Sequence, residues 1–490
     1  MGKSVGADVA ARPSPGWPPI PTGTMGAEAR DPGLLPRKAV VLNTFTPESA
    51  AALPGPGWLQ RRRSAAAEAF WSTPLPTEKD EVWRYSRIDQ LDLDRFHPAA
   101  PASTGASDRP ALLPSEQIHA LIGNLGPRSA LMVTIDGVLA TVASGVDEDL
   151  LALGRLSERD GHCTLLGSVA SDPHGFQLLN DAFAVEPLVV DIAPATTIDE
   201  PIVVVHVVSG ADGDAQFPRT VIRAGEGSTA GVVEIAVGAG TALLADQAPR
   251  TGPVSRAEGG PPERLVVPVT EVTVSDGATF SLVSMQSLGR NDWVLAHQAS
   301  VIGADATLHS FAVALGGNYA RLRTDSTLAG TSGTSLLRAA FIGRDDQMLD
   351  FRTLQDHSAP RTTSDLLFMG AVADQSHSVY SGLIRVRRGA VRADAMQTNH
   401  NLVLDEGAHA DSVPNLDIEE NDVRCSHGST VGPVDEDQRY YLESRGVEPE
   451  VAERLIVAGF FEDIAGQVPI AGTRPLIGRA LADRTGVHGG

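Results

Sequence analysis

The 490-residue sequence contains only two cysteines, Cys163 and Cys425, and only three lysines, Lys3, Lys38 and Lys79. Two thiols exclude a framework of disulfides, and so low a count is typical of a protein in a reducing compartment. Because no lysine follows Lys79, Schiff-base chemistry and P-loop binding of ATP are excluded for most of the chain.

Aromatic residues and long apolar runs are also scarce. Aromatic residues make up 5% of the sequence, so the core must be built from Val, Leu, Ile and Ala, which suits layered strands. No apolar run is long enough to span a bilayer, and the first forty residues lack the hydrophobic stretch of a signal peptide. The net charge of −22 repels nucleic acids and anionic membranes. We therefore expect a cytoplasmic protein that binds neither.

The N-terminal third shows mixed signals. Residues 1–40 are rich in Pro, Gly and Ala without periodicity, and we expect them to be disordered. Helix-forming residues follow at Trp58–Phe70, and a hairpin is predicted from Leu131 to Val142 around Asp136-Gly137. Two short helices are expected at Leu165–Ala170 and Phe176–Ala184.

From Leu188 to Ile418 short β-branched runs alternate with glycine-containing turns. Among the runs predicted to be strands are Leu188–Ile192, Ile202–Val208, Arg219–Ala224 and Leu265–Val274. Gly277, Gly303 and Gly330 are almost evenly spaced, and weak repetition of strands without helices is typical of a solenoid of parallel strands. Glycine would supply the positive φ that tight corners require. An all-β sandwich also has many short strands and remains the alternative.

Helical patterns return after Val431, so the sequence predicts four regions. These are a disordered segment (1–40), a helical or α+β region (41–185), a parallel β core (186–430) and a C-terminal helical domain (431–490).

Cys425 and His427 form the most distinctive chemical motif. On a strand their side chains lie on one face, where a thiolate and an imidazole can both ligate iron. Arg424 and His427 would favour the thiolate form of Cys425. Two cysteines cannot supply four thiolates, so a cluster here would be transient or shared with another chain. For six other histidines we favour ordinary turn or surface roles: His297, His309, His357, His377, His400 and His409.

The C-terminal third resembles the SufB/SufD family of iron–sulfur cluster assembly proteins. The strongest similarity is Asn421–Gly428 (NDVRCSHG), followed by Thr430–Gly432 (TVG) and Tyr441–Gly446 (YLESRG). Weaker similarity lies at Gln397–Leu404, and Leu75–Thr77 with Trp83–Tyr85 is similar to the N-terminal element of the SufD type. SufB-type chains carry glutamate where this chain has Gly428, so the resemblance is to the SufD type.

This resemblance implies a mainly β protein, with a right-handed parallel β-helix between an N-terminal helical region and a C-terminal helical domain. It implies a non-catalytic scaffold that pairs with a SufB-like subunit through the β-helix and binds a SufC-like ATPase through the C-terminal helices. His427 matches a SufD histidine at the assembly interface, and Cys425 is its neighbour. The chain would hold no tight cofactor, only a transient Fe–S cluster shared with the partner, and reduced flavin would act, if at all, on the complex.

Other readings of the sequence remain open. A β-helix carbohydrate-active enzyme or polysaccharide-binding protein is one, although low aromatic content and the missing signal peptide count against it. A homodimeric scaffold, or a substitute for SufB, is another. The sequence leaves open the cluster type, the sulfur donor, the stoichiometry, the start at Met1 or Met25, and the role of Cys163, which we expect to be a buried small residue.

Overall fold

The computed structural model describes residues 44–99, 115–159, 161–170, 175–238 and 262–485. These residues belong to one compact unit, 42–490, whereas the segment predicted to be disordered lies outside the described residues. Among the described residues no helix is both long and apolar enough to cross a membrane.

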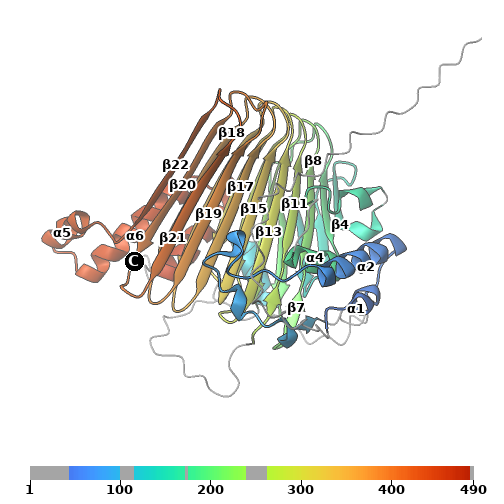
Figure 1. The fold of residues 1–490 in the computed structure, drawn as a ribbon, viewed down its shortest axis with the longest axis horizontal. Coiled ribbons are helices and arrows are strands. Elements are labelled where there is room, and N and C mark those ends of the chain that lie inside the picture. The colour runs from blue at the N-terminus through green and yellow to red at the C-terminus, as the bar shows by residue number, and fades with distance from the viewer. Residues whose placement is uncertain (1–43, 100–114, 160, 171–174, 239–261, 486–490) are drawn as a thin grey trace, which may run out of the picture. The chain divides into compact units, whose positions relative to one another are not determined.

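The architecture is a parallel β-solenoid, as the sequence predicts, with helices at both ends of the chain (Figure 1). Successive strands alternate between two facing sheets. The 12-stranded sheet has the order β21-β19-β17-β15-β13-β11-β8-β5-β4, with β1, β7 and β10 at its side. Its strands are β1 (His97–Pro98), β4 (Leu151–Arg155), β5 (Leu188–Ile192), β7 (Asp214–Gln216), β8 (Arg219–Ala224), β10 (Leu265–Val266), β11 (Val269–Val274), β13 (Trp293–Ile302), β15 (Tyr319–Leu328), β17 (Met348–His357), β19 (His377–Val386) and β21 (His409–Ile418).

The 10-stranded sheet has the order β22-β20-β18-β16-β14-β12-β9-β6-β2-β3. The predicted hairpin lies at its far end, where β2 and β3 pair in antiparallel orientation and β2 pairs in parallel with β6. Its strands are β2 (Ala130–Ile135), β3 (Val138–Ser144), β6 (Ile202–Val208), β9 (Thr229–Gly238), β12 (Thr279–Ser287), β14 (Thr307–Ala314), β16 (Thr334–Gly343), β18 (Thr363–Val372), β20 (Asp394–Val403) and β22 (Arg424–Gly432).

The corners of the solenoid differ from the prediction that glycine makes them. From β9 to β20, each strand of the 10-stranded sheet is preceded by a corner residue with positive φ, two positions before the strand begins. Only the first two of these six residues are glycines. The six positions are Gly227, Gly277, Asp305, Ser332, Arg361 and Arg392. Each donates its backbone N–H to a carbonyl of the next coil, which continues the hydrogen-bond ladder around the corner. This bond offsets the cost that a side chain incurs at positive φ.

The evenly spaced Gly303 and Gly330 serve a different purpose from the corners. Neither has positive φ. A Cβ on Gly330 would collide with the backbone of Gly303 and Ala304 in the preceding coil. These glycines therefore let the coils stack closely at that point.

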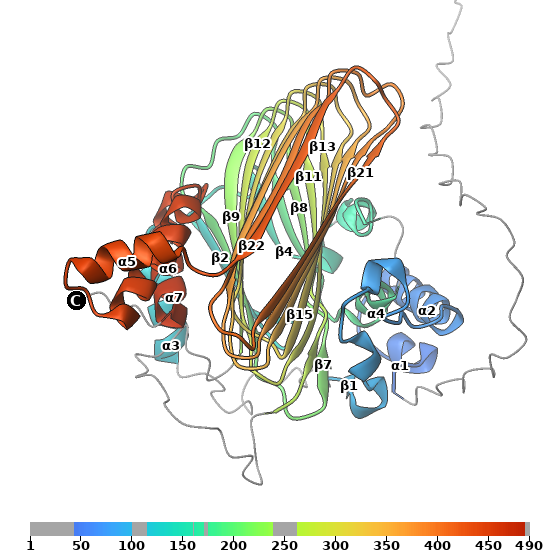
Figure 2. The same cartoon turned by 60° about the vertical axis from the view of Figure 1, so that its left-hand side comes forward.

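Helices cover the outer faces of both sheets, and Figure 2 shows the two groups on opposite sides of the solenoid. The helices α1, α2 and α4 pack with the 12-stranded sheet in one apolar cluster, which includes Phe45, Phe183 and Leu295. The helix α3 lies in the other group, where Leu121 joins the cluster of the C-terminal helices. The C-terminal helices pack on the 10-stranded sheet through residues such as Phe461 and Ile477. The helices are α1 (Pro47–Ala51), α2 (Gly57–Ser72), η1 (Glu81–Trp83), η2 (Ile88–Gln90), η3 (Leu93–Arg95), α3 (Ser115–Asn124), η4 (Leu156–Glu158), η5 (His162–Leu165), α4 (Phe176–Phe183), α5 (Glu436–Ser444), α6 (Pro449–Ala465), η7 (Ala471–Thr473) and α7 (Arg474–Thr485).

The predicted helix at Leu165–Ala170 is wrong. Only Leu165 lies in a short 3-10 helix, and the rest forms turns and bends. The buried carboxylate of Glu271 accepts backbone N–H bonds from Gly167, Val169 and Ala170. These backbone groups therefore bond to a distant strand instead of to a helical turn.

Candidate functional site

The last strand, β22, carries the motif that the sequence singled out. It is the terminal strand of the 10-stranded sheet and pairs on one side with β20, with Cys425 opposite Ala395 and His427 opposite Gln397. Ala395 and Gln397 are buried inside the solenoid. Because register partners in a parallel sheet share a face, Cys425 and His427 both point toward the solenoid interior at its open end.

Cys425 is half-buried against Ile384, Ala393 and Ala395. Burial raises the pKa of the Cys425 thiol, and the carboxylate of Asp394 raises it further. The prediction that neighbouring Arg424 and His427 favour the thiolate is therefore wrong. In the isolated chain Cys425 is a protonated thiol at neutral pH, and a metal or a partner's charge would have to displace its proton.

His427 is exposed and lies over a buried amide. Gln397 beneath it is fully buried, and neither of its side-chain polar atoms has a hydrogen-bond partner among the described residues. Gly382 makes room for this amide, because a Cβ there would collide with Gln397 Oε1 and Tyr380 Oη. The interior below His427 is thus polar instead of filled with aliphatic side chains.

Further polar side chains continue this layer inside the last coils. Buried side-chain atoms without partners among the described residues also occur in Gln355, Ser378, Asn401 and Ser412. Earlier coils combine apolar side chains such as Leu282 and Leu308 with buried polar groups such as His206 and Glu234, which bond each other. Among the described residues, the two amides whose oxygen and nitrogen both lack partners, Gln355 and Gln397, lie in the coils nearest to Cys425 and His427.

The open end also exposes apolar side chains that face inward. Leu416 and Ile418 follow the register of Ile384 and Val386, which are fully buried one coil earlier. In the terminal coil they are 38% and 42% exposed, and Val431 on β22 is 43% exposed. These three residues, the terminal apolar row, occupy core positions that no further coil of this chain covers.

The other histidines do not join this site. His400 lies on β20 beside Thr430, on the outer face opposite to Cys425 and His427. His357 is buried inside the solenoid between Thr362 and Ser364. His297 bonds Gln177 and Asp325, and His309 is half-buried, with its pKa lowered by burial and by Arg338. His377 and His409, which are distant in sequence, lie directly opposite each other.

Cys163 lies in η5. Its neighbour His162 bonds Asp191 of β5, which places η5 beside the first coil. Its side chain is exposed, so the prediction of a buried residue is wrong. Seven strand-to-strand steps separate β5 from β21, about 34 Å at the usual spacing. Cys163 and Cys425 therefore cannot bind one cluster within a single chain.

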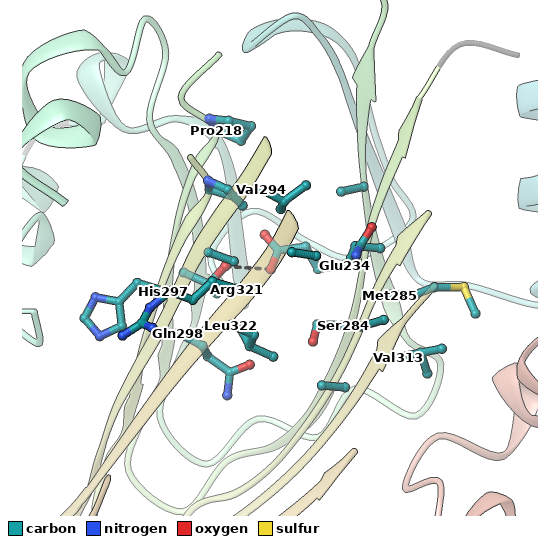
Figure 3. Close-up of a pocket in the computed structure, with 18 of the residues that line it drawn as sticks. Pro218, Glu234, Ser284, Met285, Val294, His297, Gln298, Val313, Arg321 and Leu322 are labelled. Carbon is teal, nitrogen blue, oxygen red and sulfur yellow. Dashed lines mark hydrogen bonds between the residues drawn. The ribbon is translucent and has the colours of Figure 1, made fainter. Parts of the chain in front are cut away.

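A small cavity of about 90 Å³ lies in the middle of the solenoid, bordered by a buried ionic network. Glu234 bonds His206 and Thr270, and His206 also bonds Thr134. Burial alone would raise the pKa of Glu234, but the bonds from His206 and the threonines hold it below its ordinary value. Figure 3 shows Glu234 and Ser284 at the cavity, with the His297 ring on the far side of its strand. The network has its partners within the chain and serves as a structural link between the sheets.

A larger cleft of about 540 Å³ separates residues 81–85 from the 12-stranded sheet, and several arginines line it. Arg321 and Arg352 both bond the buried carboxylate of Asp350. Arg323 and Arg385 pair with Asp325 and Asp417 in the same sheet. Because carboxylates balance these cations, the cleft has little excess charge for an anionic ligand.

The helices α5 and α6 present a second apolar surface. Tyr440 and Tyr441 on α5 are 74% and 58% exposed, and Val451 and Leu455 on α6 are also exposed. Other α6 residues, such as Phe461, pack on the solenoid. This exposed set, the helical surface, is distinct from the residues that anchor the helices.

Comparisons with known proteins agree with this architecture. The family model described as "SUF system FeS cluster assembly, SufBD core domain" matches residues 206–460, more than half of the chain. An iron–sulfur cluster assembly SufBD family protein of Mycobacterium tuberculosis is 34% identical over 219 residues, which cover 43% of this chain and 55% of that protein. The match thus spans only about half of the mycobacterial relative.

Two relatives carry the name iron–sulfur cluster assembly protein SufD. The one from Escherichia coli is 26% identical over 80% of this chain and 85% of its own length. The one from Bacillus subtilis is 32% identical over 42% of this chain and 47% of its own length. The residues that the family model matches include the solenoid from β7 to β22, with Cys425 and His427, and most of α6. The chain therefore belongs to the SufBD family of the SUF iron–sulfur cluster assembly system.

Proposed function

We propose that this chain is a SufD-like scaffold subunit that pairs with a SufB-like chain at the open end of the solenoid. The observation that carries the proposal is the terminal coil, where Cys425 and His427 share the inward face with the terminal apolar row. An exposed apolar surface rimmed by polar groups is typical of a protein interface.

The edges of both sheets support the same pairing. Within the described chain, β21 and β22 each pair with one neighbouring strand and leave a row of backbone groups for another chain. Pro414 is compatible with the edge position of β21 but removes one donor from its outer edge, so pairing there would use the other backbone groups. A SufB-like solenoid end would cover Leu416, Ile418 and Val431 and extend the sheets.

The iron–sulfur cluster would be the cargo of this interface. One thiol and one imidazole on the same face supply two ligands, and the remaining ligands would come from the SufB-like chain or the sulfur donor. The scaffold itself would be non-catalytic and without a tightly bound cofactor. Reduced flavin, if used, would act on the complex. The family match to assembly proteins argues against a carbohydrate-active enzyme.

The helical surface would bind a SufC-like ATPase. Tyr440, Tyr441 and Leu455 are large and exposed. Their helices follow directly in the chain after β22, the strand that carries the cluster site. Exposed aromatic residues are enriched at protein interfaces, which supports this assignment. ATP would be bound by the partner, since the chain has no lysine beyond Lys79.

The proposal is tested by reconstituting the complex from this chain and its SufB-like and SufC-like partners, with the His427→Ala variant. Because His427 is exposed, its loss should leave the fold intact while cluster formation, followed by absorbance and iron content, falls at least about tenfold. His400→Ala is the matched control, since this side chain lies on the outer face of the adjacent strand. Equal cluster formation by His427→Ala and His400→Ala would refute the assigned role of His427.

A further inference from the structure

Three potential metal ligands meet on the outer face of the 12-stranded sheet, away from Cys425 and His427. His377 on β19 and His409 on β21 both approach the carboxylate of Asp411. His377 Nε2 lies 2.8 Å from Asp411 Oδ2, and His409 Nε2 lies 3.3 Å from Asp411 Oδ1. The three ligand atoms all lie within 4.8 Å of one another.

The solenoid itself creates this cluster. His377 and His409 are one coil apart and occupy the same register position, which stacks their rings with centroids 5.0 Å apart. Asp411 follows His409 by two residues and therefore points to the same face. The alternate residue, Ala410, is buried on the inner face, which fixes the orientation of the strand.

The surroundings hold the cluster in place. On β17 and β19, Met348 and Val379 share its face and pack with Ile88 of the N-terminal region. The side chains of His377 and Asp411 are only 24% and 25% exposed, while that of His409 is open to solvent.

We propose that His377, His409 and Asp411 form a mononuclear binding site for a divalent transition-metal ion. Metal–ligand distances of about 2.0–2.2 Å place neighbouring ligand atoms about 3.0–3.5 Å apart, and the two measured contacts to Asp411 are close to this range. Small ring rotations would admit the ion. Two imidazoles and one carboxylate are the ligand set of mononuclear ferrous sites, with positions left for water or a further ligand.

This site is separate from the proposed cluster interface. His409 and Asp411 lie at the start of β21, whereas Cys425 follows the turn at the end of β21, on the order of 25 Å away along the strand. The residues of this chain alone support a metal site. That the bound ion is ferrous iron, held for cluster assembly, rests on the proposed function.

The test is metal binding by the full, isolated chain. We expect calorimetric titration with Zn²⁺, and anaerobic titration with Fe²⁺, to show one site that is weakened at least about tenfold in His409→Ala and Asp411→Asn. Co²⁺ bound at the site should show an absorption spectrum of mixed nitrogen and oxygen coordination, which both variants lose. Because His409 is exposed, His409→Ala keeps the test valid even if a variant at a more buried ligand fails to fold.

The matched control is His97→Ala. His97 is also an exposed histidine paired with a carboxylate, Asp214, but among the described residues it belongs to no group of three potential metal ligands. Its loss should leave the titration unchanged. The proposal is overturned if the chain binds no ion, or if His97→Ala weakens binding as much as His409→Ala does. His427→Ala should not affect this titration, so failure here is distinguishable from failure of the proposed cluster interface.

Discussion

His357 makes the stability of the solenoid dependent on pH. It is fully buried, its two ring nitrogens bond Thr362 and Ser364, and burial lowers its pKa to about 4, despite opposing effects from Asp356 and Asp394. In the unfolded chain the pKa is about 6.5, so the unfolded state binds the proton first as pH falls. The stabilisation that neutral His357 provides is therefore fully present above about pH 6.5 and is lost progressively as the pH falls to about 4. From the two pKa values, the free energy of unfolding decreases by about 2 kcal/mol when the pH reaches 5.

The perturbation is His357→Gln, which retains hydrogen-bonding groups but does not titrate. Urea unfolding followed by circular dichroism at pH 7 and pH 5 should show that the variant loses about 2 kcal/mol less stability than the wild type over this interval. Thr362→Val is the control, since it removes a hydrogen bond to His357 and should lower stability by about 1 kcal/mol at both pH values. An identical pH dependence in wild type and His357→Gln would refute the reasoning.

Two further predictions concern packing. Gly382→Ala should destabilise the chain by about 1–3 kcal/mol in urea unfolding, because the new methyl group would collide with Tyr380 and Gln397; unchanged stability would contradict the close packing of this layer. Asp350→Asn should lower the free energy of unfolding by about 3–5 kcal/mol, because Arg321 and Arg352, which are buried, lose the carboxylate that they share. These arginines also bond the carbonyls of Val82 and Arg84, so protease cleavage within residues 81–85 should accelerate; unchanged cleavage would exclude this anchoring role.

The solenoid could be predicted because its physical cause is local and repeated. The runs Leu188–Ile192, Ile202–Val208 and Arg219–Ala224 are strands with the expected bounds. The run predicted at Leu265–Val274 is divided into β10 and β11, because Pro268 between them has no N–H for the ladder. Strand identity followed from β-branched residues and turns, which act within a few positions of the chain.

Long-range bonds explain the failures. The predicted helix at Leu165–Ala170 does not form, because Gly167 and Ala170 donate their backbone N–H groups to Glu271, about a hundred residues away. No local sequence pattern reveals such a distant partner. The corners at Asp305 and Arg361 tolerate positive φ because each donates its N–H to the following coil. In both cases a partner distant in sequence outweighs the local preference.

The candidate site was predictable in part. The shared face of Cys425 and His427 followed from strand alternation, whereas the raised pKa of Cys425 depends on packing that the sequence does not display. For His377 and His409 the sequence alone favours ordinary turn or surface roles. Their separation of 32 positions is close to one coil of the solenoid, and this spacing was the signal that could have paired them.

Amide hydrogen exchange with and without a SufB-like partner tests the central claim most directly, namely that the terminal coil is the pairing surface. On complex formation, exchange should slow in β21 and β22, whose outer edges would gain backbone partners. The strand β3, the edge at the opposite end of the 10-stranded sheet, is the internal control and should exchange at its original rate. Protection at β3 with none at β22 would contradict the account.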